Sequence, residues 1–224
     1  MPTYQLRVWV PDRPGALGAV ASRIGAVRGD LIGIDILERG AGRAIDELVV
    51  DLPDARLVPL LLSEVAEVDG VDVEDIRPVR TGAVDGRLDA LETAALLCDQ
   101  HSVADLLETM AARAARDFDA DWAVVLDPGP IVALASVGTP PDAAWLHAFV
   151  AGSRLSLTSA PAGGPDDVAW AEMVAADLVV LLGRRGRPLR ARERRQLTAL
   201  AMIVDARWHE LACRTARTLH PSAR

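Results

Sequence analysis

The sequence predicts a two-domain α+β protein, and three observations support this fold class. Apolar residues in positions 1–80 follow the order strand, helix, strand, strand, helix, strand, as judged by their periodicity. Residues 81–87 contain two glycines and are typical of a linker. Residues 88–216 return to long helical patterns around a hairpin and a buried strand, and residues 217–224 are predicted to be a tail.

The first strand and the first helix are separated by a short loop. Residues 4–11 alternate between apolar and polar, with Leu6, Val8 and Val10 on one face. The apolar residues after the loop recur at spacings of three and four, as in an amphipathic helix, namely Leu17, Val20, Ile24 and Val27. A second strand is predicted over residues 30–38 because isoleucines alternate along it.

The remaining elements of the first 80 residues complete a ferredoxin-like plan. A glycine-containing turn at residues 40–43 leads into a third strand over residues 45–52. A second amphipathic helix follows from Leu57 to Val68, and a last strand covers residues 71–76 and stops at Pro78. Two helices on one face of a four-stranded antiparallel sheet form the ferredoxin-like arrangement.

The second domain is predicted to combine helices with a sheet. A helical pattern runs from Leu88 to Phe118 with a break at residues 100–102, where Ser102 and Asp105 fit a helix cap. Residues 122–126 and 131–135 form a hairpin around a Pro-Gly-Pro turn, and residues 178–182 form a buried strand. Residues 152–167, rich in Ser, Gly and Pro, are expected to be a loop, and a closing helix is expected over residues 191–215.

Composition removes several classes of protein. All 24 basic residues are arginines, so chemistry that needs a lysine, such as a Schiff base or a P-loop, is excluded. The net charge of −8 gives no long-range attraction for nucleic acid. No apolar run is long enough to span a membrane, so we expect a soluble, cytoplasmic protein. Cys98 and Cys213 belong to no paired motif, and we expect both to be buried free thiols.

The loop between the first strand and the first helix is the strongest candidate for a site. It consists of Asp12, Arg13, Pro14, Gly15, Ala16 and Leu17. The fixed φ of proline suits the start of a helix, and glycine lets the backbone approach a ligand closely. The N–H groups that open a helix bind small anions such as a carboxylate. The alternative is an ordinary strand-to-helix turn with solvated charges.

These residues and the predicted element order resemble an ACT domain over residues 4–79. The resemblance rests on the sequence Asp-Arg-Pro-Gly-Ala-Leu in the loop and on Gly29-Asp30-Leu31 at the start of the second strand. It implies a non-enzymatic regulatory module that binds an amino acid at a homodimer interface, with no metal and no cofactor. The implied ligand contacts are the loop residues 12–17 and Asp30, where the family commonly has an asparagine.

The second domain resembles a GAF domain in the order of its helices, hairpin, strand and arginine-rich turn. GAF domains bind small molecules or serve as dimerisation modules, and the resemblance implies one of these roles. Together the two resemblances predict a ligand sensor. Binding would tie the loop of one copy to the second strand of its neighbour and shift the C-terminal domains.

Two rival functions stay open. An enzyme with an acid–base or metal site would use the C-terminal half, where His209 and Cys213 are spaced four apart and would share a helix face. A structural helix end is the better interpretation of this pair. A pure protein-interaction module would instead use an exposed sheet edge.

Two further features of the C-terminal half have simple structural explanations. Seven arginines between residues 184 and 195 are expected to form a solvated turn and helix face rather than a nucleic-acid patch, since no aromatic residue accompanies them. Trp122, Trp145 and Trp170 are expected to be core anchors.

Overall fold

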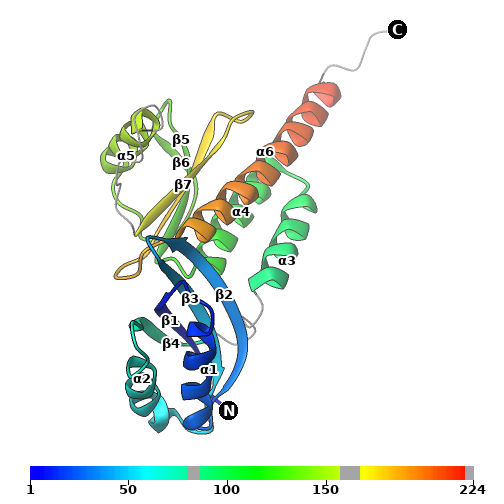
Figure 1. Ribbon diagram of the computed structural model, residues 1–224. Helices are drawn as coiled ribbons and strands as arrows, with labels where there is room; N and C mark the ends of the chain where they lie inside the picture. The colour runs from blue at the N-terminus through cyan, green and yellow to red at the C-terminus, as the bar shows by residue number, and fades with distance from the viewer. Residues whose placement is uncertain (80–85, 157–166, 220–224) are drawn as a thin grey trace. The chain divides into compact units, whose positions relative to one another are not determined.

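The computed structural model describes residues 1–79, 86–156 and 167–219, and the chain divides into two compact units, Met1–Gly86 and Arg87–Arg224. Each unit is α+β and contains one four-stranded antiparallel sheet (Figure 1). No helix in the described ranges combines the length and the apolar character that a bilayer crossing requires.

The N-terminal unit has the predicted ferredoxin-like topology. Its elements are β1 (Thr3–Pro11), α1 (Ala16–Ala26), β2 (Asp30–Gly40), β3 (Arg43–Asp51), a short 3-10 turn η1 (Ala55–Leu57), α2 (Val58–Ala66) and β4 (Asp72–Pro78). The strand order is β2-β3-β1-β4, so β2 and β4 are the edges. Both helices cover the same face of the sheet (Figure 1).

The periodicity of the sequence explains the core of this unit. The alternating residues Leu6, Val8 and Val10 of β1 face the helices and are at most 1% exposed. Val20 and Ile24 of α1 pack against them and are fully buried. The edge strand β2 is different, because its isoleucines remain open to solvent: Ile32, Ile34 and Ile36 are 41%, 44% and 37% exposed.

The C-terminal unit is a three-layer arrangement. Its elements are α3 (Gly86–Cys98), α4 (Val103–Asp117), β5 (Trp122–Asp127), β6 (Val132–Gly138), α5 (Ala143–Ser156), β7 (Val168–Met173), β8 (Leu178–Gly183) and α6 (Ala191–Leu219). The strand order is β6-β5-β8-β7. One face of the sheet packs against α4 and α6, and the other packs against α5. Because both faces are covered, the central strands β5 and β8 are continuous apolar runs.

Several local predictions for this unit are confirmed. The helical break falls between α3 and α4, where the Ser102 hydroxyl accepts the Asp105 N–H at 3.1 Å and caps α4. The hairpin β5–β6 and the buried strand β8 also occur as predicted.

Three local predictions are wrong. Residues 152–156 are helical rather than loop, because Leu146 and Val150 anchor α5 to the sheet and outweigh the weak helix propensity of Gly152. Residues 157–166 of that predicted loop lie outside the described residues. The predicted tail begins too early, since α6 continues to Leu219. Both cysteines are exposed, because Leu97, next to Cys98, and Leu211, two residues before Cys213, occupy the positions that face the core.

Candidate functional site

The loop between β1 and α1 has a fixed backbone. The N–H of Asp12 donates to the carbonyl of Gly42 at 2.9 Å, which ties the loop to the β2–β3 hairpin. The N–H of Arg13 donates to Pro11 at 2.8 Å, and that of Ala16 donates to Arg13 at 3.3 Å. Gly15 precedes the helix with φ +85°, a left-handed conformation that favours glycine over every other residue type.

This geometry leaves backbone donors free at the start of α1. The helix has no side-chain cap. Within the described chain, the N–H groups of Gly15, Leu17 and Gly18 find no hydrogen-bond acceptor, whereas that of Ala19 donates to Gly15 at 3.0 Å. The helix dipole adds positive potential at the same end. The start of α1 is therefore suited to a small anion.

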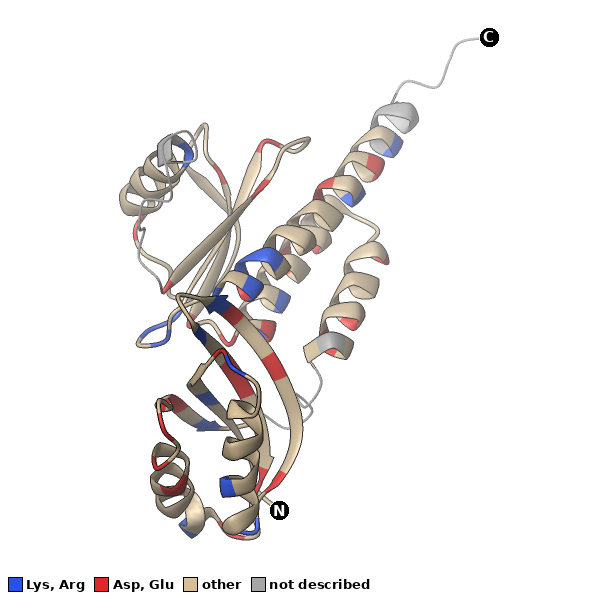
Figure 2. Cartoon of the chain, viewed as in Figure 1, with Lys and Arg blue, Asp and Glu red and all other residues tan. Residues whose placement is uncertain are grey.

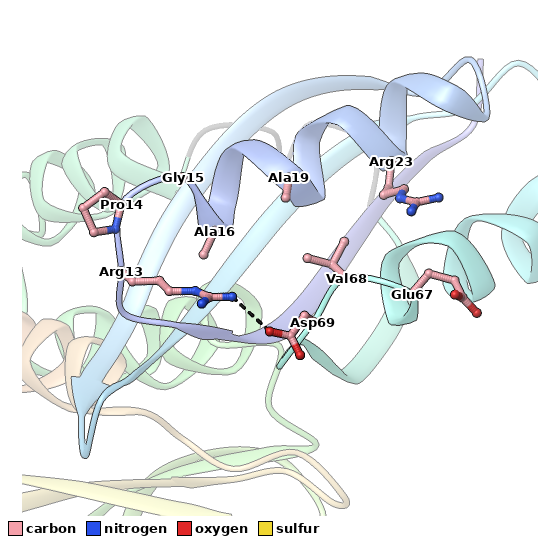
Figure 3. A pocket seen from close by; sticks show the side chains of 9 residues that line it. All are labelled: Arg13, Pro14, Gly15, Ala16, Ala19, Arg23, Glu67, Val68 and Asp69. Atoms are coloured by element: carbon pink, nitrogen blue, oxygen red, sulfur yellow. Dashed lines mark hydrogen bonds and ion pairs between the residues drawn. The ribbon is translucent and has the colours of Figure 1, made fainter.

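A shallow pocket of about 370 Å³ opens beside this helix start (Figure 3). Four of the predicted site residues line it, namely Arg13, Pro14, Gly15 and Ala16. Ala19 and Arg23 of α1 and the segment 67–69 complete the lining. The Arg13 guanidinium pairs with Asp69 across the pocket at 3.1 Å, as the dashed line in Figure 3 marks. This pair is exposed and contributes little energy.

The other three predicted site residues lie elsewhere. Asp12 is exposed beside the β2–β3 hairpin, and Leu17 packs in part against the core. Asp30 begins β2 and pairs with Asp51 at the end of β3, whereas the loop follows the opposite end of β1, next to Arg43. Roughly nine residues of strand, or ~30 Å, separate Asp30 from the loop within one chain.

A buried carboxyl near the loop was missed by the sequence analysis. Asp46 lies on β3 between Val8 of β1 and Ile36 of β2, on the sheet face that the helices cover. It is 4% exposed, and its Oδ1 has no hydrogen-bond partner in the described residues. Burial raises the pKa of Asp46, the Arg39 charge opposes this rise, and the Asp12 charge adds to it. Its position within an alternating strand gave no sign of these properties.

The opposite face of the same sheet carries a buried arginine. Arg7 is 2% exposed and donates to the Glu47 carboxylate at 2.7 Å, with Glu74 a further 3.8 Å contact. Trp9 donates its indole N–H to Glu74 at 2.7 Å. Paired charges therefore replace apolar residues on this face, and the arrangement has a structural role.

The arginine-rich turn before α6 is coloured blue in Figure 2. Contrary to the predicted solvated surface, two of its side chains are buried. Arg184 is 4% exposed and donates to the carbonyls of Phe118, Arg187 and Pro188 at 2.7–2.9 Å. It also pairs with Glu193 at 2.7 Å. Arg187 is 6% exposed because it folds back toward Asp119 at 3.3 Å. The buried carbonyls around the turn require donors, and these two arginines supply them.

The remaining candidates in the C-terminal unit lie apart from one another. His209 Nε2 and Cys213 Sγ are 3.7 Å apart on the exposed side of α6. Across the described residues, no three His, Cys, Asp or Glu side chains are grouped closely enough to hold a metal ion. Trp122 and Trp170 belong to the core cluster under α5 as predicted, whereas Trp145 is 38% exposed and stacks on Phe149.

No family model matches this chain, and a search of curated proteins found no relative. Among solved structures, the chain is similar to the ACT domain from the GTP pyrophosphokinase of Chlorobium tepidum. The identity is 14% and the TM-score 0.29, over 35% of this chain and all of that domain. At this level the similarity gives no information on the ligand, so the proposed function depends on the residues of this chain.

Proposed function

We propose that this chain is a regulatory protein that binds a small zwitterion, such as an amino acid, at the start of α1. The single observation that carries the proposal is the set of three unsatisfied N–H groups at Gly15, Leu17 and Gly18. The first N–H groups of a helix have no acceptor within the helix, and a carboxylate satisfies several of them at once. The rigid loop holds them ready before binding, which limits the entropy lost on association.

A homodimer formed through β2 would complete the site. β2 is an edge strand of 11 residues whose isoleucines are exposed, and an open edge of this length pairs readily with another strand. If β2 pairs antiparallel with its own copy about its middle, Asp30 of the partner subunit approaches Gly40. Gly42 and Asp12 are adjacent to that end of the strand. The loop and Asp30, far apart in one chain, would then meet across the interface.

The C-terminal unit is proposed to be GAF-like, with a role in ligand sensing or dimerisation. Its four-stranded sheet between α5 on one side and α4 with α6 on the other supports this assignment. We propose no enzymatic activity for it. Its buried arginines are used in structural hydrogen bonds, and His209 and Cys213 are on an exposed helix face.

A charge placed at the helix start tests the proposal without disturbing the fold. Gly18 is the third residue of α1, and a Cβ at this position meets no atom within 4 Å. Gly18→Glu should keep or raise stability, because glutamate is a better helix former than glycine and suits the first turn. Its carboxylate would nevertheless repel an anionic ligand. Gly18→Gln is the matched control, with the same size and no charge.

The measurement is a thermal-shift screen of the full chain against the twenty amino acids, followed by calorimetric titration of those that bind. We expect at least one amino acid to raise the Tm of the wild type in a saturable manner, as binding to the native state requires. Gly18→Gln should retain most of this affinity, and Gly18→Glu should lose at least ~10-fold. If no amino acid raises the Tm of the wild type, amino-acid binding is refuted. If Gly18→Glu binds the ligand as tightly as the wild type does, the helix start is not the anion site.

A further inference from the structure

We propose that α6 binds a zinc ion between two copies of this chain, through His209 and Cys213 of each copy. The ligand site at the start of α1 makes no use of this pair, which belongs to the other compact unit. The inference therefore goes beyond the proposed function, because it adds a metal-dependent association of the C-terminal unit. Either claim can fail without the other.

The two side chains have the separation that a tetrahedral zinc ion requires. They are four residues apart on a helix, so they lie on one face, about one turn apart. His209 Nε2 and Cys213 Sγ are 3.7 Å apart. A Zn–N bond of about 2.0–2.1 Å and a Zn–S bond of about 2.3 Å, at the tetrahedral angle, place nitrogen and sulfur roughly 3.6 Å apart. One ion therefore bridges the pair without a change in the helix backbone.

Both ligand atoms are available to a metal ion. The side chains of His209 and Cys213 are exposed, and within the described residues neither has a polar partner except the other. The adjacent acid, Glu210, is held by Arg207 at 2.7 Å. A thiolate and an imidazole are the two ligand types that structural zinc sites use most. The pair is thus exposed, unoccupied by other protein groups and of the right chemistry.

One chain supplies only half of such a site. A structural zinc site has four protein ligands, and no third His, Cys, Asp or Glu of the described chain joins this pair in a metal-binding group. The other exposed thiol, Cys98, ends α3, and the loop that follows contacts α6 where Arg207 donates to the Gln100 carbonyl at 2.7 Å. Arg207 and His209 are two positions apart and point to different faces of α6. A second copy supplies the two missing ligands in the same geometry.

The exposed face of α6 suits the close approach of a second α6. Ala199, Met202 and Ala206 precede the pair at spacings of three and four, which is the repeat of a helix–helix seam, and all three are exposed. Met202 is 66% exposed. No charged residue belongs to this stripe, and its alanines allow two helix axes to approach to about 8 Å. A two-fold axis through the ion relates the two pairs, so both copies use the same stripe.

The ligand set favours zinc over other cations. Two thiolates and two imidazoles form the set found in many structural zinc sites, and sulfur ligands disfavour magnesium and calcium. On binding, each Cys213 thiol gives its proton to solvent and each His209 binds in its neutral form. The two thiolate charges then balance the charge of the ion. Because neither copy holds four ligands, the free energy of metal binding is expressed as association of two chains.

The experiment titrates the full chain, without an affinity tag, with zinc chloride while light scattering follows its mass. The protein is kept reduced with a phosphine and carries Ile34→Lys, so that the open β2 edge does not pair. Cys213→Ala and His209→Ala each remove a ligand, whereas Ala206→Arg keeps both ligands and holds two helices apart. Cys98→Ala is the matched control, because it removes the other exposed thiol. The last four substitutions are at exposed positions and should leave the fold intact.

We expect zinc to double the mass at one ion per two chains, and an excess of EDTA to reverse this change. Cobalt in place of zinc should give the visible absorption of a tetrahedral site with thiolate ligands. Loss of an outer-shell partner alone costs about 10–100-fold in metal affinity, so loss of a ligand in Cys213→Ala or His209→Ala should cost at least ~100-fold. Ala206→Arg should bind one ion per chain weakly and keep its metal-free mass. Cys98→Ala should behave as its parent.

The same titrations define the results that contradict the site. If Cys213→Ala binds zinc as tightly as its parent, or if Cys98→Ala loses binding, the ion is held by other groups. If zinc binds through His209 and Cys213 but the mass does not double, the ion is not shared between copies. Doubling that persists in Ala206→Arg would overturn the stripe on α6 as the surface through which two copies meet.

Discussion

Arg184 offers a sharp test of how the C-terminal unit is stabilised. We consider Arg184→Met, which keeps an unbranched apolar stem about as long as the arginine chain up to Nε and removes the guanidinium group. Arg184 is 4% exposed, and its three nitrogen atoms all have acceptors. The substitution therefore keeps the packing of the stem, while three carbonyl oxygens and the Glu193 carboxylate lose a donor.

The expected loss in the free energy of unfolding can be worked out from the partners of Arg184. Each buried acceptor that loses its donor costs about 1 kcal/mol. Glu193 keeps the backbone N–H of Arg190 at 2.8 Å, so its penalty stays near ~1 kcal/mol as well. The four losses together predict a destabilisation of about 3–5 kcal/mol. With a denaturant slope of about 4 kcal/mol per molar, the guanidinium chloride midpoint should fall by about 1 M.

Tryptophan fluorescence can monitor this transition selectively. Four of the five tryptophans belong to the C-terminal unit, and only Trp9 belongs to the N-terminal one. Arg185→Ala is the control, because this neighbouring side chain is exposed and only its backbone N–H is used, by Asp121 at 2.9 Å. We expect the control to stay within about 0.5 kcal/mol of wild type. If Arg184→Met is no more destabilising than the control, the turn is not held by this guanidinium.

Three further perturbations have defined outcomes. Asp46→Asn should stabilise the ligand-free protein at pH 7 by about 1–2 kcal/mol. Burial raises the folded-state pKa of Asp46 above its ordinary 3.8, so burying this carboxyl costs stability only where it is ionised, and the stability gained by Asp46→Asn should shrink as pH falls toward about 4. Denaturant unfolding of both proteins from pH 4 to 7 measures this difference. A difference that is constant or grows on acidification contradicts burial of the ionised carboxyl as its cause. Thr93→Val should destabilise the C-terminal unit by about 1–3 kcal/mol, since the buried hydroxyl donates to Asp117 at 2.5 Å, and an unfolding midpoint equal to wild type would count against this contact. Ile34→Lys should convert the proposed β2 dimer into a folded monomer in light scattering, and a dimer that survives this charge does not form through β2.

The fold of the N-terminal unit was predictable because each of its elements has a clear period. Leu6, Val8 and Val10 alternate, and the apolar residues of α1 recur every three or four positions, so strand and helix were distinguishable. The C-terminal unit was harder to predict. α5 contains Gly152 and Ser156 near its end, and only the packing of Leu146 and Val150 against the sheet fixes it as a helix.

The site was predictable only in part, for a related reason. Pro14 and Gly15 mark the loop in sequence, because proline and glycine have specific backbone requirements. Whether a carboxyl or a guanidinium is buried depends on which strands and loops surround it. Asp46 and Arg184 therefore had no signal in the sequence, although one is an unpaired acid near the loop and the other holds a turn together.

The most direct test of the central claim is calorimetric titration of the full wild-type chain with the amino acid that most raises its Tm, repeated with Gly18→Glu. Ligand binding at the start of α1 predicts one saturable site per chain in the wild type. It also predicts an affinity at least ~10-fold weaker in the stably folded variant. If no amino acid binds, or if the variant binds as tightly as wild type, the free N–H groups of α1 are not a ligand site.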